Sequence, residues 1–481
     1  MSLARKAAGA TAWVAGTTYL NQGITFLANV ALMRLIAPDA FGVLALAVFF
    51  STLGRKVVAF GFNHALIHKQ DELPTAIGSH LLLHLASAVI VIAGSVLAFP
   101  LVAAHYDRLT AAVLIGVCVG AAFESAGNTP RILLEKEVEF RGLLLVNLGV
   151  NVGVSIVSVL GAWIWPNVWV LLFRLATTEL ACMIGYWRIN PRPPMAKPTW
   201  DMIRWYIRFG TPLWLGGIAT LAVLQFDDFL VGTLISAKEL GYYNRAYALA
   251  VLPTTMVTHI VARVAFPLYS KLQHDREKLS ATFGMVVKFI VLVSGPAAFG
   301  LAYCAPEFIG VVFGDQWRPM AMLVRLLIIY EVLRPIFDDV GELFTAVGHP
   351  RKIGRIQIVQ AISVVLFATP AVYFFSSSGA AVAVGLVMAI GVFLAYRDLT
   401  AHVTINLWDI FAVPMVCCAL ATAISALILW HWPIQSEAWR LMAKIAAFGA
   451  GTVALIFTFQ GRRLIADYRL IKAQLTGKET T

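Results

Sequence analysis

The chain has 481 residues, of which 59% are hydrophobic and only 13% are charged, with a formal net charge of +11 at pH 7. This composition excludes the class of soluble globular proteins and indicates a polytopic membrane protein. The excess of basic residues lies in short segments between apolar stretches, so it does not indicate a nucleic-acid partner, and we expect none.

The apolar stretches predict the transmembrane helices in chain order. A helix needs roughly 20 apolar residues to cross the hydrocarbon core, and about fourteen stretches meet that length. Six are expected near residues 9–35, 41–62, 77–103, 109–129, 143–164 and 168–187, and six more near 207–234, 243–268, 283–304, 320–347, 356–375 and 380–395. Two more follow near residues 407–429 and 441–459. The predicted fold is therefore an all-α polytopic membrane protein, in which a kink at residues 376–379 is the alternative to a turn.

A repeated turn divides the chain. Residues 35–42 (LIAPDAFG) recur as residues 234–241 (LISAKELG), each after a long apolar segment. Duplication inside a membrane protein favours a transporter. We therefore predict two pseudo-symmetric six-helix lobes, residues 1–190 and 191–400, while residues 401–481 add two transmembrane helices and a basic cytoplasmic tail.

Lysine and arginine are distributed unequally between the two sets of loops. Cationic loops stay in the cytoplasm. With the N-terminus inside, the inner loops hold most of the loop cations, among them Lys69, Arg131, Lys136, Arg188 and Arg204. Both termini are therefore expected in the cytoplasm.

Local signatures of catalysis are missing from the sequence. It has no phosphate-binding Gly-x-x-x-x-Gly-Lys loop and no His-Glu-x-x-His motif, and its five cysteines have no Cys-x-x-Cys spacing. We expect neither an enzyme nor a resident cofactor or metal.

Four separated segments resemble those of one transporter family. The similar segments are residues 34–69, residues 130–136 with Phe140, residues 225–270, and residues 313–317 with 345–350. They resemble the bacterial polysaccharide transporters, the Wzx-type lipid-linked oligosaccharide flippases of the multidrug/oligosaccharidyl-lipid/polysaccharide exporter superfamily.

The resemblance implies a flippase in the bacterial inner membrane. Such a protein moves a polyprenyl-pyrophosphate-linked oligosaccharide by alternating access, for exopolysaccharide, capsule or O-antigen (lipopolysaccharide) biosynthesis. Its expected partners are this substrate and the lipid bilayer, and binding of a polysaccharide polymerase or export machinery stays open. The alternatives are a cation-coupled drug or small-molecule antiporter of the same superfamily and, third, a membrane enzyme or assembly scaffold.

Family analogy places the cavity walls on the first, second, seventh and eighth predicted helices. Among the basic side chains there, Arg55 and Lys56 in the second and His259 and Arg263 in the eighth form a candidate pyrophosphate site. The alternative is that Arg55, Lys56 and Arg263 extend to the inner interface, as long basic side chains near helix ends do.

Polar side chains on the first and seventh helices are the other candidates. Asn21, Gln22 and Gln225 are predicted to hydrogen-bond sugar hydroxyls, or else to hold helices together. For Asp227 and Asp228 the hypothesis is a coupling or gating role through a proton or sodium ion, and a fixed structural ion pair is the alternative.

Other charged and small residues are interpreted as structural. Glu124, Arg174 and Glu179 lie outside the expected cavity walls and are predicted to pair between helices. Glu331, Arg334 and Asp338 share a helical face and predict an internally neutralised network. The pairs Gly116/Gly120 and Gly149/Gly153 predict close approach of the fourth and fifth helices to neighbours.

Overall fold

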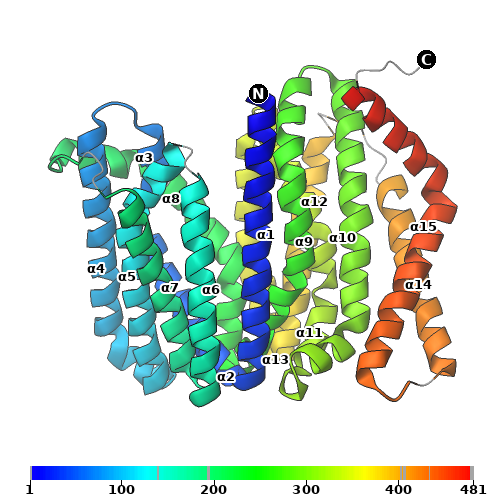
Figure 1. Cartoon of the computed structure of the whole chain (residues 1–481), viewed down its shortest axis with the longest axis horizontal. Helices are drawn as coiled ribbons and strands as arrows, with labels where there is room; N and C mark the ends of the chain where they lie inside the picture. The colour runs from blue at the N-terminus through cyan, green and yellow to red at the C-terminus, as the bar shows by residue number, and fades with distance from the viewer. Residues whose placement is uncertain are drawn as a thin grey trace. The chain divides into compact units, whose positions relative to one another are not determined.

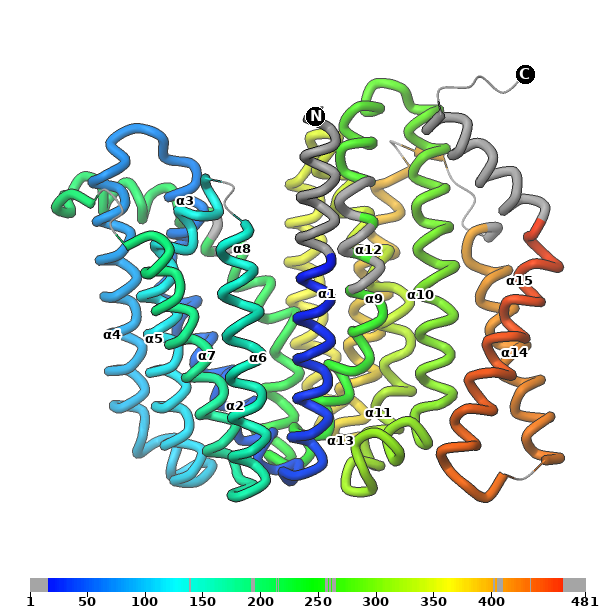
Figure 2. The backbone as a smooth tube through the Cα atoms, in the orientation of Figure 1, coloured from blue at the N-terminus to red at the C-terminus, as the bar shows by residue number. Residues whose placement is uncertain are grey.

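The computed structural model describes residues 3–137, 140–191, 195–400, 403–404, 408–432 and 434–476, and every regular element in these ranges is helical. By internal packing the chain divides into two units, residues 1–241 and 242–481. Figure 1 labels the helices and Figure 2 traces the backbone. The predicted lobes, 1–190 and 191–400 with the addition 401–481, divide the chain differently and stay a prediction, because packing does not test internal symmetry.

The first unit holds eight helices in the described ranges. They are α1 (Leu3–Leu35), α2 (Pro38–Val58), the short α3 (Phe62–His68), α4 (Leu73–His105), α5 (Arg108–Lys136), α6 (Phe140–Ile164), α7 (Val168–Ile189) and α8 (Trp200–Leu234). The next helix, α9 (Ala237–Leu272), begins in this unit and continues in the second.

The second unit contains the remaining elements. They are α10 (Arg276–Val312), η1 (Asp315–Trp317), α11 (Met320–Leu326), α12 (Ile328–Ala346), α13 (Pro350–Leu399), η2 (Trp408–Ala412), α14 (Val413–His431) and α15 (Glu437–Thr476). Over the described residues of both units, ten helices are long and apolar enough to cross a membrane. The predicted class, an all-α multi-pass membrane protein, is confirmed, and the count of fourteen stays a prediction.

The 50-residue α13 is two antiparallel arms rather than one rod. The Gln360 amide donates to the Val387 carbonyl at 3.4 Å, although a straight helix would separate these residues by about 40 Å at 1.5 Å per residue. The chain reverses at Ser376, whose φ is 55°. A Cβ on Gly379 would lie 1.9 Å from the Ala371 carbonyl oxygen, so only glycine fits beside the turn. The predicted spans 356–375 and 380–395 are these two arms.

Helix α5 is at the centre of the first unit. It packs against α2, α4 and α7, and half of its apolar window is buried. A Cβ on Gly116 would lie 2.4 Å from the Leu172 side chain, and one on Gly120 would lie 3.3 Å from the Ala176 Cα. The glycines thus let the α7 backbone approach closely, as the spacing predicts.

The two copies of the repeated turn lie against each other within residues 1–241. A Cβ on Gly42 would lie 1.6 Å from the Ala237 carbonyl oxygen, and one on Gly241 would lie 2.0 Å from the Pro38 carbonyl oxygen. The first turns of α2 and α9 therefore meet backbone to backbone, and the repeat is an architectural motif.

The Gly42→Ala substitution tests this contact. We expect it to destabilise the folded protein by about 1–3 kcal/mol, the usual cost of forcing atoms into a well-packed contact. The measurement is thermal unfolding of purified protein in detergent micelles. The matched control is Gly149→Ala, because a Cβ at Gly149 would meet no atom of the described residues within 4 Å. Equal melting temperatures for the two variants would contradict the account.

Candidate functional site

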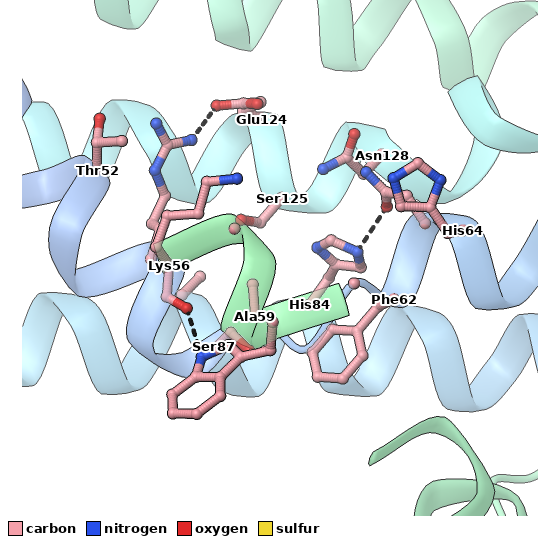
Figure 3. Close-up of a pocket in the computed structure, with 16 residues that line it drawn as sticks. Thr52, Lys56, Ala59, Phe62, His64, His84, Ser87, Glu124, Ser125 and Asn128 are labelled. Carbon is pink, nitrogen blue, oxygen red and sulfur yellow. Dashed lines mark hydrogen bonds and ion pairs between the residues drawn. The ribbon is translucent and has the colours of Figure 1, made fainter. Parts of the chain in front are cut away.

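A polar cavity of about 460 Å³ opens inside the first unit (Figure 3). It lies where α2 ends and α3 begins, and α4, α5 and α8 complete its walls. The break between α2 and α3 depends on Gly61, whose φ of 62° is the left-handed conformation that glycine adopts readily. Its polar lining includes Thr52, Arg55, Lys56, Asn63, His64, His84, Ser87, Glu124, Ser125, Asn128 and Trp214.

Arg55 and Glu124 form an ion pair across this cavity between α2 and α5. About a third of each side chain is exposed, 33% for Arg55 and 35% for Glu124. In an apolar helix bundle such a pair neutralises both charges, and removing one residue leaves the charge of the other without a partner. The charges that line this cavity are Arg55, Lys56 and Glu124, which leaves one positive charge when the histidines are neutral.

Lys56 supplies the excess positive charge. It lies in the last turn of α2, and no acidic partner is recorded for it in the ranges that the structure describes. A Cβ on Gly217 of α8 would lie 3.9 Å from the Lys56 Nζ. The absence of a side chain at Gly217 therefore leaves space beside the Lys56 ammonium. The Trp214 indole N–H donates to the Lys56 carbonyl at 2.8 Å and fixes the end of α2 against α8.

Two histidines lie one turn apart on α4, and His84 lines the cavity. His80 and His84 both contact the Asn63 Oδ1 through Nε2, at 3.2 and 3.0 Å. His80 also contacts the Thr129 hydroxyl at 2.9 Å and is fully buried. The sequence analysis missed this cluster, although two histidines at i and i+4 in an apolar helix were a visible signal.

A second cavity of about 570 Å³ lies between α1, α5, α6 and α7. Glu124 and Asn128 line both cavities. Besides these two, its polar lining is formed by Asn21, Thr25, Arg131, Glu135, Asn147, Asn151, Arg174, Thr178, Glu179, Cys182 and Tyr186. Apart from Glu124, which pairs with Arg55, its charged lining consists of Glu135, Glu179, Arg131 and Arg174. These two negative and two positive charges balance when all four residues are ionised.

The structure brings three of the predicted substrate-binding residues to these cavities. Arg55 and Lys56 line the first cavity, and Asn21 lines the second. Asn21 also takes part in helix packing, because the Asn151 amide donates to its Oδ1 at 2.7 Å. Gln22 and Gln225 are half-buried and line neither cavity.

The remaining predicted residues lie on α8 and α9. Asp227 is buried at 2% exposure, Asp228 is half-buried, and neither lines the two cavities. His259 and Arg263 belong to α9, but their side chains lie outside the described part of the chain.

Three residues predicted to lie outside the cavity walls in fact line them. Glu124 lies between the two cavities, and Arg174 and Glu179 line the second. The expected walls were placed on other helices, and these two cavities also extend to α5 and α7. The predicted pairing between helices holds for Glu124, and the Arg174 guanidinium donates to the Asn29 Oδ1 at 2.7 Å.

In the second unit, the network predicted on α12 is present in part. Arg334 pairs with Asp338 at 3.8 Å and donates to the Tyr330 hydroxyl at 2.8 Å. Glu331 instead accepts a hydrogen bond from Thr254 of α9 at 2.9 Å.

Polar, charged cavities inside a bundle of membrane-spanning helices are typical of secondary transporters. The model of the polysaccharide biosynthesis protein family matches residues 31–322, more than half of the chain, and this protein belongs to that family. It is similar to the lipopolysaccharide biosynthesis protein WzxC of Escherichia coli (strain K12), with 24% identity over 350 residues that cover 72% of this chain and 71% of the relative.

Two solved structures share its fold. The lipid II flippase MurJ in an inward closed conformation has a TM-score of 0.73 at 13% identity, covering 93% of this chain and 98% of that chain. An inward-facing multidrug resistance MATE family transporter of the MOP superfamily has a TM-score of 0.58 at 16% identity, covering 78% and 94%. These likenesses concern the fold, which this chain shares with both proteins.

Proposed function

We propose that this protein moves a polyprenyl-pyrophosphate-linked oligosaccharide from the cytoplasmic to the periplasmic leaflet of the inner membrane by alternating access, for exopolysaccharide, capsule or lipopolysaccharide biosynthesis. Its family and its similarity to WzxC and to the fold of MurJ support this function. The observation that carries it is the cavity with Arg55 and Lys56 inside the helices of the first unit.

The cavity addresses the physical difficulty of the reaction. A pyrophosphate and a sugar chain cannot enter hydrocarbon, whereas the polyprenyl tail can remain there. Lys56 offers an uncommitted ammonium, and the guanidinium of Arg55 can bind phosphate oxygens with two parallel hydrogen bonds. Because Glu124 pairs with Arg55, an incoming pyrophosphate competes with the Glu124 carboxylate for this guanidinium.

The distribution of basic residues supports an orientation with both termini in the cytoplasm. Lys56, Lys69, Arg131, Lys136 and Arg188 all lie at the end of the first unit where α2 and α5 end. By the positive-inside rule this end faces the cytoplasm. In that orientation the first cavity lies toward the side on which the lipid-linked substrate is made.

One observation favours a second function, cation-coupled export of a drug or small molecule. The second cavity is lined by Glu179, for which no ion pair is recorded in the described ranges, and a cationic substrate requires an acidic site. A deletion strain distinguishes the two functions. Loss of the flippase leaves lipid-linked oligosaccharide in the cytoplasmic leaflet and removes surface polysaccharide, and re-expression of the wild type reverses both. Unchanged glycan with new sensitivity to cationic drugs would establish the antiporter instead.

A coupling ion and partner proteins complete the proposal. We propose that a proton or sodium gradient drives transport through Asp227 and Asp228, and that a polysaccharide polymerase and export machinery receive the product.

The variants Asp227→Asn and Asp228→Asn test the coupling role. We expect at least one of them to fold, to retain substrate binding and to lose the dependence of transport on pH or sodium, because an amide cannot exchange a proton or neutralise a cation. Transport is measured over a range of pH and sodium concentrations. Wild-type ion dependence in both folded variants would remove these residues from coupling.

A further inference from the structure

The second cavity differs from the first in the chemistry of its walls. Four asparagine amides, from α1, α5 and α6, face it together with the hydroxyl groups of Thr25, Thr178 and Tyr186. Amides both donate and accept hydrogen bonds, as sugar hydroxyls do. We propose that this cavity is the saccharide subsite, in which the first sugars of the substrate bind while the pyrophosphate occupies the first cavity. This inference rests on the proposed function.

Charge separates the two subsites. The first cavity has one excess positive charge, from Arg55 and Lys56 against Glu124. Apart from the shared Glu124, the second is lined by two glutamates and two arginines, whose charges balance when all are ionised. An anionic pyrophosphate is therefore attracted to the first cavity, whereas the second offers it no net positive charge.

Part of the amide set already holds the helices together. The Asn151 amide nitrogen lies within 3.1 Å of three acceptors, which are the carbonyl oxygen and Oδ1 of Asn21 and the hydroxyl of Thr25. It has only two hydrogens to donate. The Asn147 Oδ1 accepts from the Tyr186 hydroxyl at 2.6 Å. These groups form a rigid frame between α1, α6 and α7.

Asn128 is not used in this way. It is 8% exposed, and no hydrogen bond to its amide is recorded in the part of the chain that the structure describes. Figure 3 shows it at the cavity wall. An amide at a cavity wall can donate and accept hydrogen bonds. Because Asn128 lines both cavities, a ligand that spans them can bind to it.

Glu179 is the second uncommitted group. It faces the second cavity from α7, and within the described ranges it has no recorded hydrogen bond or ion pair. A carboxylate in this position can accept hydrogen bonds from two neighbouring hydroxyls of a sugar ring. An ionised phosphate has no such pair of hydroxyl donors.

The order of groups in the substrate matches the order of the cavities. In a lipid-linked oligosaccharide the first sugar is bonded directly to the pyrophosphate, so the two subsites must adjoin. They do so at Glu124 and Asn128, which line both cavities. Asn128 is then a specificity-determining residue for the sugar next to the pyrophosphate.

The test measures the two parts of the substrate separately. Full-length protein in lipid nanodiscs is titrated with two probes, inorganic pyrophosphate and the free oligosaccharide released by acid from the lipid-linked pool of the host strain. Binding is followed by saturation-transfer NMR. We expect Asn128→Ala and the isosteric Glu179→Gln each to weaken oligosaccharide binding about tenfold, the effect of losing one buried hydrogen-bonding group. Pyrophosphate binding should change less than about twofold in both variants.

A control variant and a second test variant make every outcome informative. Asn190→Ala applies the same truncation at the end of α7, outside both cavities, and should bind both probes like the wild type. If Asn128→Ala does not fold, Glu179→Gln decides. Wild-type oligosaccharide affinity in the folded variants, or wild-type protein that binds pyrophosphate alone, overturns the subsite and leaves the proposed flippase intact. Failure of the proposed function is recognised separately, by unchanged surface glycan in the deletion strain.

Discussion

The Lys56→Glu variant is expected to lose transport by at least about a hundredfold while folding normally. One pair of unit charges 4 Å apart contributes about 4 kcal/mol at an effective dielectric constant near 20, and the substitution turns this attraction into repulsion. Lys56 has no recorded acidic partner in the described ranges, so its removal strands no carboxylate. Transport is measured as surface polysaccharide restored to a deletion strain.

Lys197→Glu is the matched control for this variant. Lys197 is exposed, lies in the segment before α8 and lines neither cavity, so the same change of charge should leave transport near the wild-type level. Wild-type transport by both variants would contradict the role of Lys56. Loss of transport in both would point to a general effect of charge at this end of the protein.

The second large effect is expected at the ion pair between Arg55 and Glu124. Glu124→Gln should destabilise the protein by about 1–3 kcal/mol, less than the 3–5 kcal/mol of a fully buried pair, because a third of each side chain is exposed. The cause is the Arg55 guanidinium left without its carboxylate. Thermal unfolding in detergent gives the measurement.

The double variant Arg55→Gln/Glu124→Gln separates stability from function. With both charges removed, most of the lost stability should return, because no charge is stranded. Transport should stay impaired, since the guanidinium that binds phosphate is absent. Recovery of transport along with stability would show that Arg55 acts only in packing.

Arg55 and Lys56 could be predicted from the sequence because charge in an apolar helix needs water, a partner or a ligand. The other residues that line the same cavity could not be predicted. Glu124 carries a charge too, but its place on the fourth predicted span gave no reason to connect it with the second. Asn128 and His84 gave weaker signals still, since an uncharged polar residue in a membrane helix is common and its environment depends on helix rotation.

The glycine pairs show the same limit for helix packing. Spacing places Gly116 and Gly120 on one face, and that face meets α7. Gly149 and Gly153 have the same spacing, yet a Cβ at either would meet no atom of the described residues within 4 Å, so close approach is not seen there. Spacing determines which residues share a face, whereas the tertiary fold determines what that face meets.

The proposed function requires that the first cavity bind the pyrophosphate while the substrate crosses the membrane. The most direct test reconstitutes the purified protein in liposomes with a polyprenyl-pyrophosphate oligosaccharide and measures how much of the lipid becomes accessible to an impermeant glycosidase outside. The account predicts transfer by the wild type that Lys56→Glu abolishes and inorganic pyrophosphate inhibits. Equal transfer by wild type, Lys56→Glu and empty liposomes would contradict it.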